Sequence, residues 1–330
     1  MIENLRLRHE VLRATWSDFT SQWEVEVKNL ETGHVHVETA DFFVSAAGRL
    51  NVPKMPDIPG LETEFKGHLS HTAAWDPGFD FSGKTVAIIG NGASGQQLMT
   101  NLLPHVARIH HYAQSRQWIL PTFQKNLIEA TADLPGGYVF SEEEKEKFAT
   151  DHQAYLEFRR QLEVNLHGSF RGYVVGSAEN QELRDRCTET MLRRLGGDQS
   201  WMERLTPAYA PGCKRLTPAP GYLEALKNPK VEYVDDVITH ATATGLVTAD
   251  GRLRTVDAIV AATGFRNGFL PLFPTIGKNG LDLSKLWASD GPVGYPETYF
   301  GVMAPDMPNY FAVLQVFVLL CGLDFTADRR

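Results

Sequence analysis

The sequence predicts an α/β protein, and three observations support that fold class. The short apolar run Thr85–Ile89 has the composition of a buried parallel strand, and it is followed by the glycine-rich turn Gly90–Gly95 and a helical run at Gln96–Leu103. Residues 1–50 contain segments in which apolar and polar residues alternate, as in antiparallel strands. Residues 122–210 are largely helical in pattern. Together these features predict a Rossmann-like α/β fold with a helical insertion.

Each glycine of the turn has a physical role at its position. Gly90 would permit the tight turn, Gly92 would let the backbone approach a pyrophosphate, and Gly95 would let the helix pack closely on the strand. Free N–H groups at the helix N-terminus would face the phosphates. A GxGxxG pattern is weak by itself, but the strand before it and the helix after it supply the expected context. The predicted nucleotide-binding positions are Gly90, Asn91, Gly92, Ala93, Ser94 and Gly95.

The end of the next predicted strand, Arg108–Ser115, favours one nicotinamide cofactor over the other. A site for NADH usually has an acidic residue at this strand tip, for the ribose hydroxyls. No acidic residue occurs between Gln96 and Ile128, and the tip is Gln114-Ser115-Arg116. Because Ser115 and Arg116 offer hydroxyl and guanidinium groups suited to a 2′-phosphate, we expect NADPH. The alternative is that Arg116 is a solvated loop charge.

Composition is ordinary for a globular protein, and the charge excludes one class of partner. The 330 residues are 43% hydrophobic and 22% charged, which allows two domains with a core in each. The net charge of −8, with no basic stripe, argues against a nucleic-acid partner.

The cysteines and the apolar segments near the chain ends indicate the cellular compartment. Cys187, Cys213 and Cys321 are odd in number and widely spaced, which predicts neither a disulfide framework nor a metal site. The first residues contain no apolar signal-peptide core, and the apolar run Tyr310–Leu323 is too short to span a bilayer. We therefore expect a cytoplasmic protein with no transmembrane segment.

The remaining pattern predicts the other elements. A capping box at Ser141–Glu144 should begin a helix whose apolar stripe, from Phe148 to Leu166, belongs to the core rather than to a cofactor site. A second helix should cover Glu179–Leu195. The predicted strands are Leu5–Val11, Trp23–Val27, His34–Glu38, Val231–Val234, Gly245–Thr248 and Val256–Ala262, with a further buried run at Asp41–Gly48.

A motif directly before the glycine turn carries a family resemblance. The segment FKGHLSHTAAWD fits the pattern FxGxxxHxxxW(P/D) at Phe65, Gly67, His71, Trp75 and Asp76. Five matched positions placed immediately before GxGxxG are specific. The sequence here resembles the Baeyer–Villiger monooxygenases, a branch of the class B flavin monooxygenases, and is most similar to fungal-type members associated with secondary metabolism.

The resemblance continues through most of the chain and implies a two-cofactor fold. It includes Pro211–Arg215 (PGCKR), Asp257–Phe265 (DAIVAATGF) and Pro308–Phe311 (PNYF). It implies two dinucleotide domains, one for FAD and one for NADPH. It also implies that reduced flavin and O₂ convert a lipophilic carbonyl substrate, a ketone, to an ester or lactone.

The resemblance also assigns roles to individual residues. Lys214 matches the lysine that meets the NADPH 2′-phosphate, and Arg215 matches the catalytic arginine that stabilises the anionic oxygenated flavin. His71 matches the histidine that couples cofactor position to domain closure. The remaining cofactor-binding positions carried over are Trp75, Gly48, Thr263 and Gly264.

The chain also departs from the family pattern. Residues 1–50 contain no glycine-rich turn for the ADP half of FAD, and the ending VFVLLCGLDFTADRR differs from the family's. Gln114 and Arg116 stand where the family usually has Arg and Pro. We therefore expect a chain truncated at both ends, without the N-terminal FAD βαβ unit. Two alternatives stay open: an inactive remnant that binds NADPH or a partner, and an enzyme that oxygenates nitrogen or sulfur.

The predicted domain organisation follows the resemblance. Residues 1–82 would be remaining FAD-domain strands and the linker, and residues 83–121 the NADPH-binding unit. Residues 122–226 would be the helical insertion, residues 227–260 the returning strands of the NADPH domain, and residues 261–330 a partial return to the FAD domain.

Overall fold

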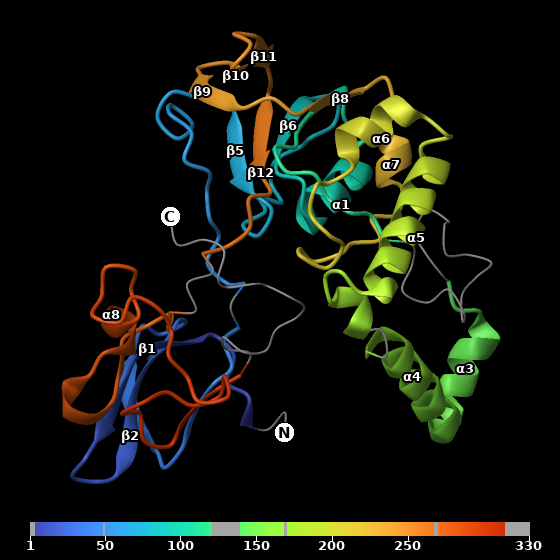
Figure 1. The fold of residues 1–330 in the computed structure, drawn as a ribbon. Helices are drawn as coiled ribbons and strands as arrows, with labels where there is room; N and C mark the ends of the chain where they lie inside the picture. Colours follow the sequence, from blue (N-terminus) through green and yellow to red (C-terminus); the bar gives the residue numbers. More distant parts are fainter. Residues whose placement is uncertain (1–3, 49, 121–138, 168–169, 267–269, 314–330) are drawn as a thin grey trace. The chain divides into compact units, whose positions relative to one another are not determined.

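The computed structural model describes residues 4–48, 50–120, 139–167, 170–266 and 270–313 (Figure 1). The chain divides into two compact units, and each is described by itself. Unit 1 comprises Met1–Lys54 and Phe265–Leu319, and unit 2 comprises Met55–Gly264 and Leu320–Arg330. The divergent chain ending and most of the apolar run before it lie outside the described residues.

Unit 2 is built on a parallel sheet of five strands. Their order is β5 (His68–His71), β12 (Ala258–Ala261), β6 (Thr85–Ile89), β7 (Arg108–Tyr112) and β8 (Val231–Val234). The predicted strand at Thr85–Ile89 is confirmed with the same bounds. It lies in the middle of the sheet, where both faces are covered, and this explains its continuous apolar sequence.

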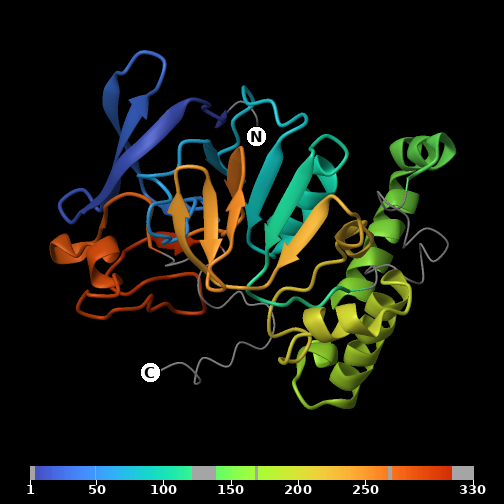
Figure 2. The ribbon, with the colours of Figure 1, turned by 90° about the horizontal axis from the view of Figure 1, so that it is seen from above.

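The two faces of β6 contribute to different cores because successive side chains alternate across a strand. Val86 and Ile88 pack with the helices, whereas Ala87 and Ile89 pack with the three-stranded antiparallel sheet. That smaller sheet consists of β9 (Ile238–Thr242), β10 (Gly245–Thr248) and β11 (Leu253–Thr255). The two layers can be followed in Figure 2, where α1 is teal and β9–β11 are orange.

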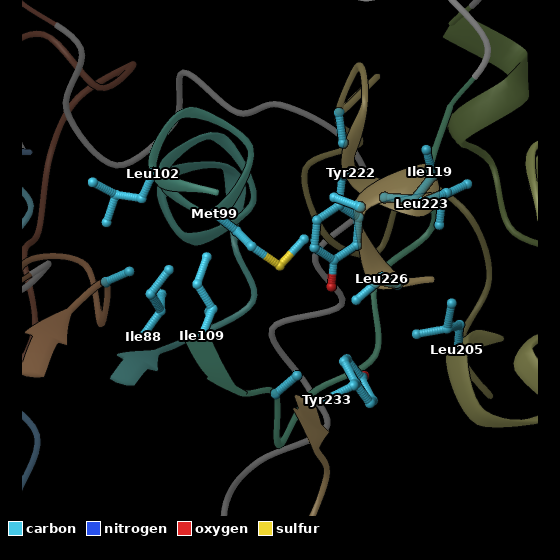
Figure 3. Packing of buried hydrophobic residues seen from close by; sticks show 14 of the residues in the cluster. Ile88, Met99, Leu102, Ile109, Ile119, Leu205, Tyr222, Leu223, Leu226 and Tyr233 are labelled. Carbon is cyan, nitrogen blue, oxygen red and sulfur yellow. The ribbon is translucent and has the colours of Figure 1, made fainter. Parts of the chain in front are cut away.

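The helices of unit 2 are α1 (Ala93–Leu102), α3 (Glu142–Thr150), α4 (His152–His167), α5 (Ala178–Arg194), α6 (Gln199–Leu205) and α7 (Tyr222–Leu226), with the short 3₁₀ helix η2 at Phe170–Tyr173. Figure 3 shows Met99 of α1 reaching toward the ring of Tyr222, with Ile88 and Ile109 side by side on neighbouring strands. All four side chains are at most 1% exposed. This apolar contact fixes α1 against the sheet and thereby positions the glycine turn.

The hairpin α3–α4 confirms one prediction and corrects another. Ser141 accepts a hydrogen bond from the Glu144 N–H at 3.1 Å, and the Glu144 carboxylate accepts one from the Ser141 N–H at 2.7 Å, so the capping box is present. The stripe beginning at Phe148 was expected in the core, but none of its described members is buried. Phe148 and Phe158 instead stack on each other with ring centroids 4.9 Å apart, because two antiparallel helices can cover their apolar stripes locally.

Unit 1 contains a four-stranded sheet of order β13-β1-β2-β3 and a two-stranded sheet β14-β4. Their bounds are β1 (His9–Ser17), β2 (Gln22–Asn29), β3 (Val35–Ala40), β4 (Phe43–Ser45), β13 (Thr275–Ile276) and β14 (Tyr310–Ala312), with η3 (Lys278–Gly280) and α8 (Leu283–Leu286) between the last two. The first strand was predicted at Leu5–Val11 and is found four residues later, beginning at His9. Its pairing with β2 continues as far as Ser17. Trp23 is fully buried in the core of this unit and donates its indole N–H to the Pro308 carbonyl at 2.8 Å.

Candidate nucleotide-binding site

The site begins where β6 ends, at a glycine that no other residue could replace without strain. Gly90 has φ of +117°, in the region where side chains are strained. A Cβ at this position would lie 2.5 Å from the Ala262 carbonyl oxygen, which follows the neighbouring strand β12. The turn is therefore tight because two adjacent strands leave room only for backbone.

The other two glycines have opposite surroundings. A Cβ on Gly95 would lie 2.0 Å from the Gly90 carbonyl oxygen, so α1 can approach β6 only with glycine here. A Cβ on Gly92 would meet no described atom within 4 Å. Gly92 is the N-cap of α1 and makes no side-chain capping bond, and the first turn contains no acidic residue. The first N–H groups of this ten-residue helix are thus suited to an anion.

Asn91 holds the turn against the tip of β7. Its side chain is 5% exposed, donates to the Ser115 carbonyl at 3.1 Å and accepts from the Tyr222 hydroxyl at 2.7 Å. Both ends of the amide are therefore engaged within the protein. Any contact of Asn91 with a nucleotide would come from its backbone.

Gln96 connects the turn to a segment more than 100 residues away in sequence. Its side-chain amide donates to the Asn91 carbonyl at 3.2 Å, and its side-chain oxygen accepts from the Thr217 hydroxyl at 2.8 Å. Gln96 is 1% exposed, so these bonds are made away from water and leave few alternatives. Thr217 follows Arg215 by two residues, and the loop that carries Lys214 and Arg215 is thereby attached to the first turn of α1.

His111 stabilises the glycine turn from the neighbouring strand β7. It is fully buried on β7, and its Nε2 lies 3.1 Å from the Gly90 carbonyl oxygen. Burial lowers the pKa of His111 to about 4, and the hydrogen bond to Gly90 only partly opposes this. The neutral ring therefore donates its Nε2–H to the backbone of the turn, flanked edge-on by Tyr222 and Tyr233.

The predicted phosphate-binding residues lie on the surface beside the turn. Ser115, Arg116 and Lys214 are all exposed. Arg116 donates through Nη1 to the carbonyls of Glu203 (3.0 Å) and Thr206 (3.2 Å), at the C-terminal end of α6. These bonds orient Arg116 rather than leaving it as a solvated loop charge, and a guanidinium has further N–H donors on its other nitrogens. The Lys214 ammonium lies 5.0 Å from the ring centroid of Tyr209.

The residues of the fingerprint lie on both sides of β5, and His71 is the last residue of that strand. His71 is 3% exposed, and its Nδ1 accepts a hydrogen bond from the Ala73 N–H at 3.0 Å. Desolvation lowers the pKa of His71, and a hydrogen bond to the Gly264 backbone opposes that shift. Trp75 is 41% exposed and stacks on Phe81 with centroids 4.9 Å apart.

The other carried-over positions are placed as follows. Thr263 and Gly264 follow β12 at the end of unit 2, and Gly264 has φ of +79°. Gly48 belongs to unit 1, with φ of +74°, and a Cβ there would meet no described atom within 4 Å. The Arg215 side chain is exposed.

Known proteins that are similar to this chain are flavin-binding monooxygenases. Residues 7–129 match the model of the flavin-binding monooxygenase-like family. Over those residues the chain is similar to that family. It is 32% identical to the FAD-binding monooxygenase tazF of Aspergillus terreus, covering 94% of this chain and 53% of the relative. A Baeyer–Villiger monooxygenase of Streptomyces coelicolor is 31% identical, with coverage of 94% and 55%. The chain thus spans about half the length of the curated relatives that it matches.

Solved structures of flavin monooxygenases share the fold. Cyclohexanone monooxygenase from Rhodococcus sp. Phi1, bound to NADP⁺, superposes with a TM-score of 0.74 at 26% identity, covering 93% of this chain and 60% of that one. OTEMO in complex with FAD and NADP superposes with a TM-score of 0.75 at 25% identity, with coverage of 94% and 62%. NADP is therefore bound in both of these structural homologues, and FAD is bound in the second.

Membrane-spanning helices and metal-binding clusters are both absent from the described residues. None of the helices in the part of the chain that the structure describes has the length and apolar content to cross a bilayer. Within the same residues, no group of three His, Cys, Asp or Glu side chains could hold a metal ion.

Sequence reasoning missed the side chains that support the site. His111, Gln96, Thr217 and Tyr222 bear no motif, and a polar residue on a helix or strand is usually expected at the surface. Their partners are between 5 and 131 residues away in the chain. The one signal was indirect: a glycine turn this tight has backbone carbonyls that need buried donors.

Proposed function

We propose that this chain is the NADPH-binding part of an FAD-dependent monooxygenase that oxygenates a lipophilic ketone with O₂. The observation that carries the proposal is the turn between β6 and α1, where Gly92 leaves the helix N-terminus open to a pyrophosphate. The similarity to the flavin-binding monooxygenase-like family and the NADP-bound homologues support it. The resemblance to fungal-type members favours a substrate from secondary metabolism.

The donor set beside the turn suits the phosphorylated nucleotide. Ser115, Arg116 and Lys214 offer one hydroxyl and two cations near the strand tip, and no carboxylate replaces them there. The Asp235 carboxylate interacts electrostatically with Arg116, but it is already paired with Arg204 at 3.0 Å. The 2′-phosphate of NADPH would therefore meet net positive charge, whereas NADH would leave those cations without an anion.

The remaining assigned residues would orient the reacting groups. The exposed Arg215 guanidinium is a cation that would stabilise negative charge developing on oxygen. His71 accepts the Ala73 N–H on Nδ1, so its neutral ring would carry the proton on Nε2, and it would hold the end of β5 near Gly264, where the chain leaves unit 2. Bound FAD would supply hydride acceptance and oxygen activation, and the chain's own task would be binding, orientation and exclusion of water.

Nucleotide binding is the first test, because it does not depend on the flavin. The purified chain is titrated calorimetrically with NADP⁺ and with NAD⁺, and we expect a clear preference for NADP⁺. Lys214→Ala should weaken NADP⁺ binding by about tenfold or more, because a charge-assisted contact to phosphate is lost. Lys145→Ala is the matched control, since Lys145 is an exposed lysine whose ammonium pairs with Glu142 on α3. Equal binding of NAD⁺ would refute the phosphate assignment.

Turnover is the second test. With FAD added, NADPH oxidation should increase when a cyclic ketone is supplied, and an ester or lactone should form. Arg215→Ala should abolish oxygenation while flavin reduction continues in part. Nucleotide binding without any flavin-dependent turnover would support an inactive binding protein, and turnover of amines or sulfides in place of ketones would support nitrogen or sulfur oxygenation.

A further inference from the structure

Tyr209 contacts both residues whose charges are proposed to meet the 2′-phosphate: the backbone of Arg116 and the ammonium of Lys214. Its hydroxyl donates to the backbone carbonyl of Arg116 at 2.7 Å and lies 3.3 Å from the Gln117 side-chain oxygen. Its ring lies 5.0 Å from the Lys214 ammonium, within the range in which a cation is attracted to an aromatic face. One side chain thus joins the tip of β7 to the loop that precedes Arg215.

Tyr209 is itself held in place by the core. The indole N–H of Trp118, which is 2% exposed, donates to the Tyr209 carbonyl at 2.8 Å. A tyrosine phenol is protonated near neutral pH and can donate a hydrogen bond, and desolvation raises the pKa of Tyr209 further, to about 12. The ring therefore has a defined position before any ligand arrives.

A site with two neighbouring cations has a cost in free energy, and the contacts of Arg116 and Lys214 reduce that cost. Like charges repel, and long side chains lose rotamer entropy when a ligand orders them. Arg116 is already oriented by the carbonyls at the end of α6, where the helix dipole favours positive charge. The face of Tyr209 does the same for Lys214, and preorganised groups bind an anion more tightly than mobile ones.

We propose that Tyr209 is a positioning residue that fixes Arg116 and Lys214 for the 2′-phosphate and thereby sets the preference for NADPH over NADH. The inference rests on the proposed function, because it assumes that the nucleotide occupies the turn at Gly92. Tyr209 does not itself touch the nucleotide in this proposal. It acts through Arg116 and Lys214: its hydroxyl holds the Arg116 backbone at the strand tip, and its ring lies beside the Lys214 ammonium.

Two substitutions separate the two contacts. Tyr209→Phe keeps the aromatic face for Lys214 and loses the bond to Arg116, whereas Tyr209→Leu loses both. The measurement is the ratio of the Kd for NAD⁺ to the Kd for NADP⁺, by calorimetry on the purified full chain. We expect the ratio to fall about threefold in Tyr209→Phe and about tenfold in Tyr209→Leu, with NAD⁺ binding unchanged within about twofold.

A matched tyrosine provides the control. Tyr155 on α4 carries a similar pair, with the Arg159 guanidinium 5.9 Å from its ring centroid, in the hairpin α3–α4. Tyr155→Leu should leave the ratio unchanged. A purely structural role of Tyr209 would weaken both nucleotides equally, and this distinguishes positioning from folding.

The possible results distinguish a failure of the Tyr209 inference from a failure of the proposed function. Wild-type protein that does not bind NADP⁺ more tightly than NAD⁺ would refute the proposed function. Wild-type preference that persists in Tyr209→Leu, or equal losses for both nucleotides, would overturn the role of Tyr209 alone. If Tyr209→Leu does not fold, Tyr209→Phe decides: an unchanged ratio together with an unchanged midpoint of thermal unfolding would reject the role of its hydroxyl.

Discussion

Adding one methyl group at Gly95 tests whether the glycine turn is as tight as the structure has it. The new Cβ in Gly95→Ala would lie 2.0 Å from the Gly90 carbonyl oxygen, whereas ordinary carbon contacts are about 3.5 Å or longer. The oxygen belongs to backbone, and the strained turn at Gly90 is itself confined by Ala262. A shift of more than about 1 Å is therefore needed where neither partner can move cheaply.

The change in the free energy of unfolding of Gly95→Ala is the sum of two opposing effects. Alanine is a better helix former than glycine by about 1 kcal/mol, and this favours the variant. Overpacking a rigid site costs about 1–3 kcal/mol and occasionally more, and the contact at Gly95 is at the severe end. We expect a net loss of about 2 kcal/mol in stability, which corresponds to about 4–8 °C in the midpoint of thermal unfolding for a unit of this size.

Gly92→Ala is the matched control, because its Cβ would meet no described atom within 4 Å and φ is −81°. Its stability should fall by no more than about 1 kcal/mol, the cost of a poorer N-cap. NADP⁺ binding should weaken nevertheless, since the methyl group would occupy the approach of the pyrophosphate. Circular dichroism gives the unfolding midpoints. A Gly95→Ala protein as stable as wild type, or less affected than Gly92→Ala, would refute this reading of the turn.

Two further predictions concern stability. Because the folded-state pKa of His111 is about 4 and lies below its usual value of 6.5, the unfolded chain binds more protons between these values, so stability should decrease by up to about 3 kcal/mol as pH falls through that window. Urea unfolding from pH 7 to pH 4 checks this, and His111→Gln should flatten the profile. Met99→Ala should cost about 2–5 kcal/mol, because Met99 is fully buried. Phe148→Ala should cost clearly less, because Phe148 is only half-buried on the hairpin; equal losses at these two positions would contradict the packing described.

The strand, the glycine turn and the capping box could be predicted from sequence because each depends on neighbouring residues. Thr85–Ile89 is apolar throughout, and the three glycines follow within six residues, so the local backbone alone restricts what the segment can form. The capping box at Ser141–Glu144 likewise closes over three residues. Helix and strand periodicity then indicated an α/β chain without any knowledge of its packing.

Partners that are distant in the chain could not be predicted in this way. The bond from Tyr209 to Arg116 joins positions 93 residues apart, and the bond from Thr217 to Gln96 joins positions 121 residues apart. The apolar stripe at Phe148 was assigned to the core for the same reason, since periodicity identifies an apolar face and does not identify what covers it. Local sequence was sufficient to identify the glycine turn and the helix that follows it. The side chains that hold this turn became known from the fold, because hydrogen bonds and ring contacts depend on distance in space and not on spacing along the chain.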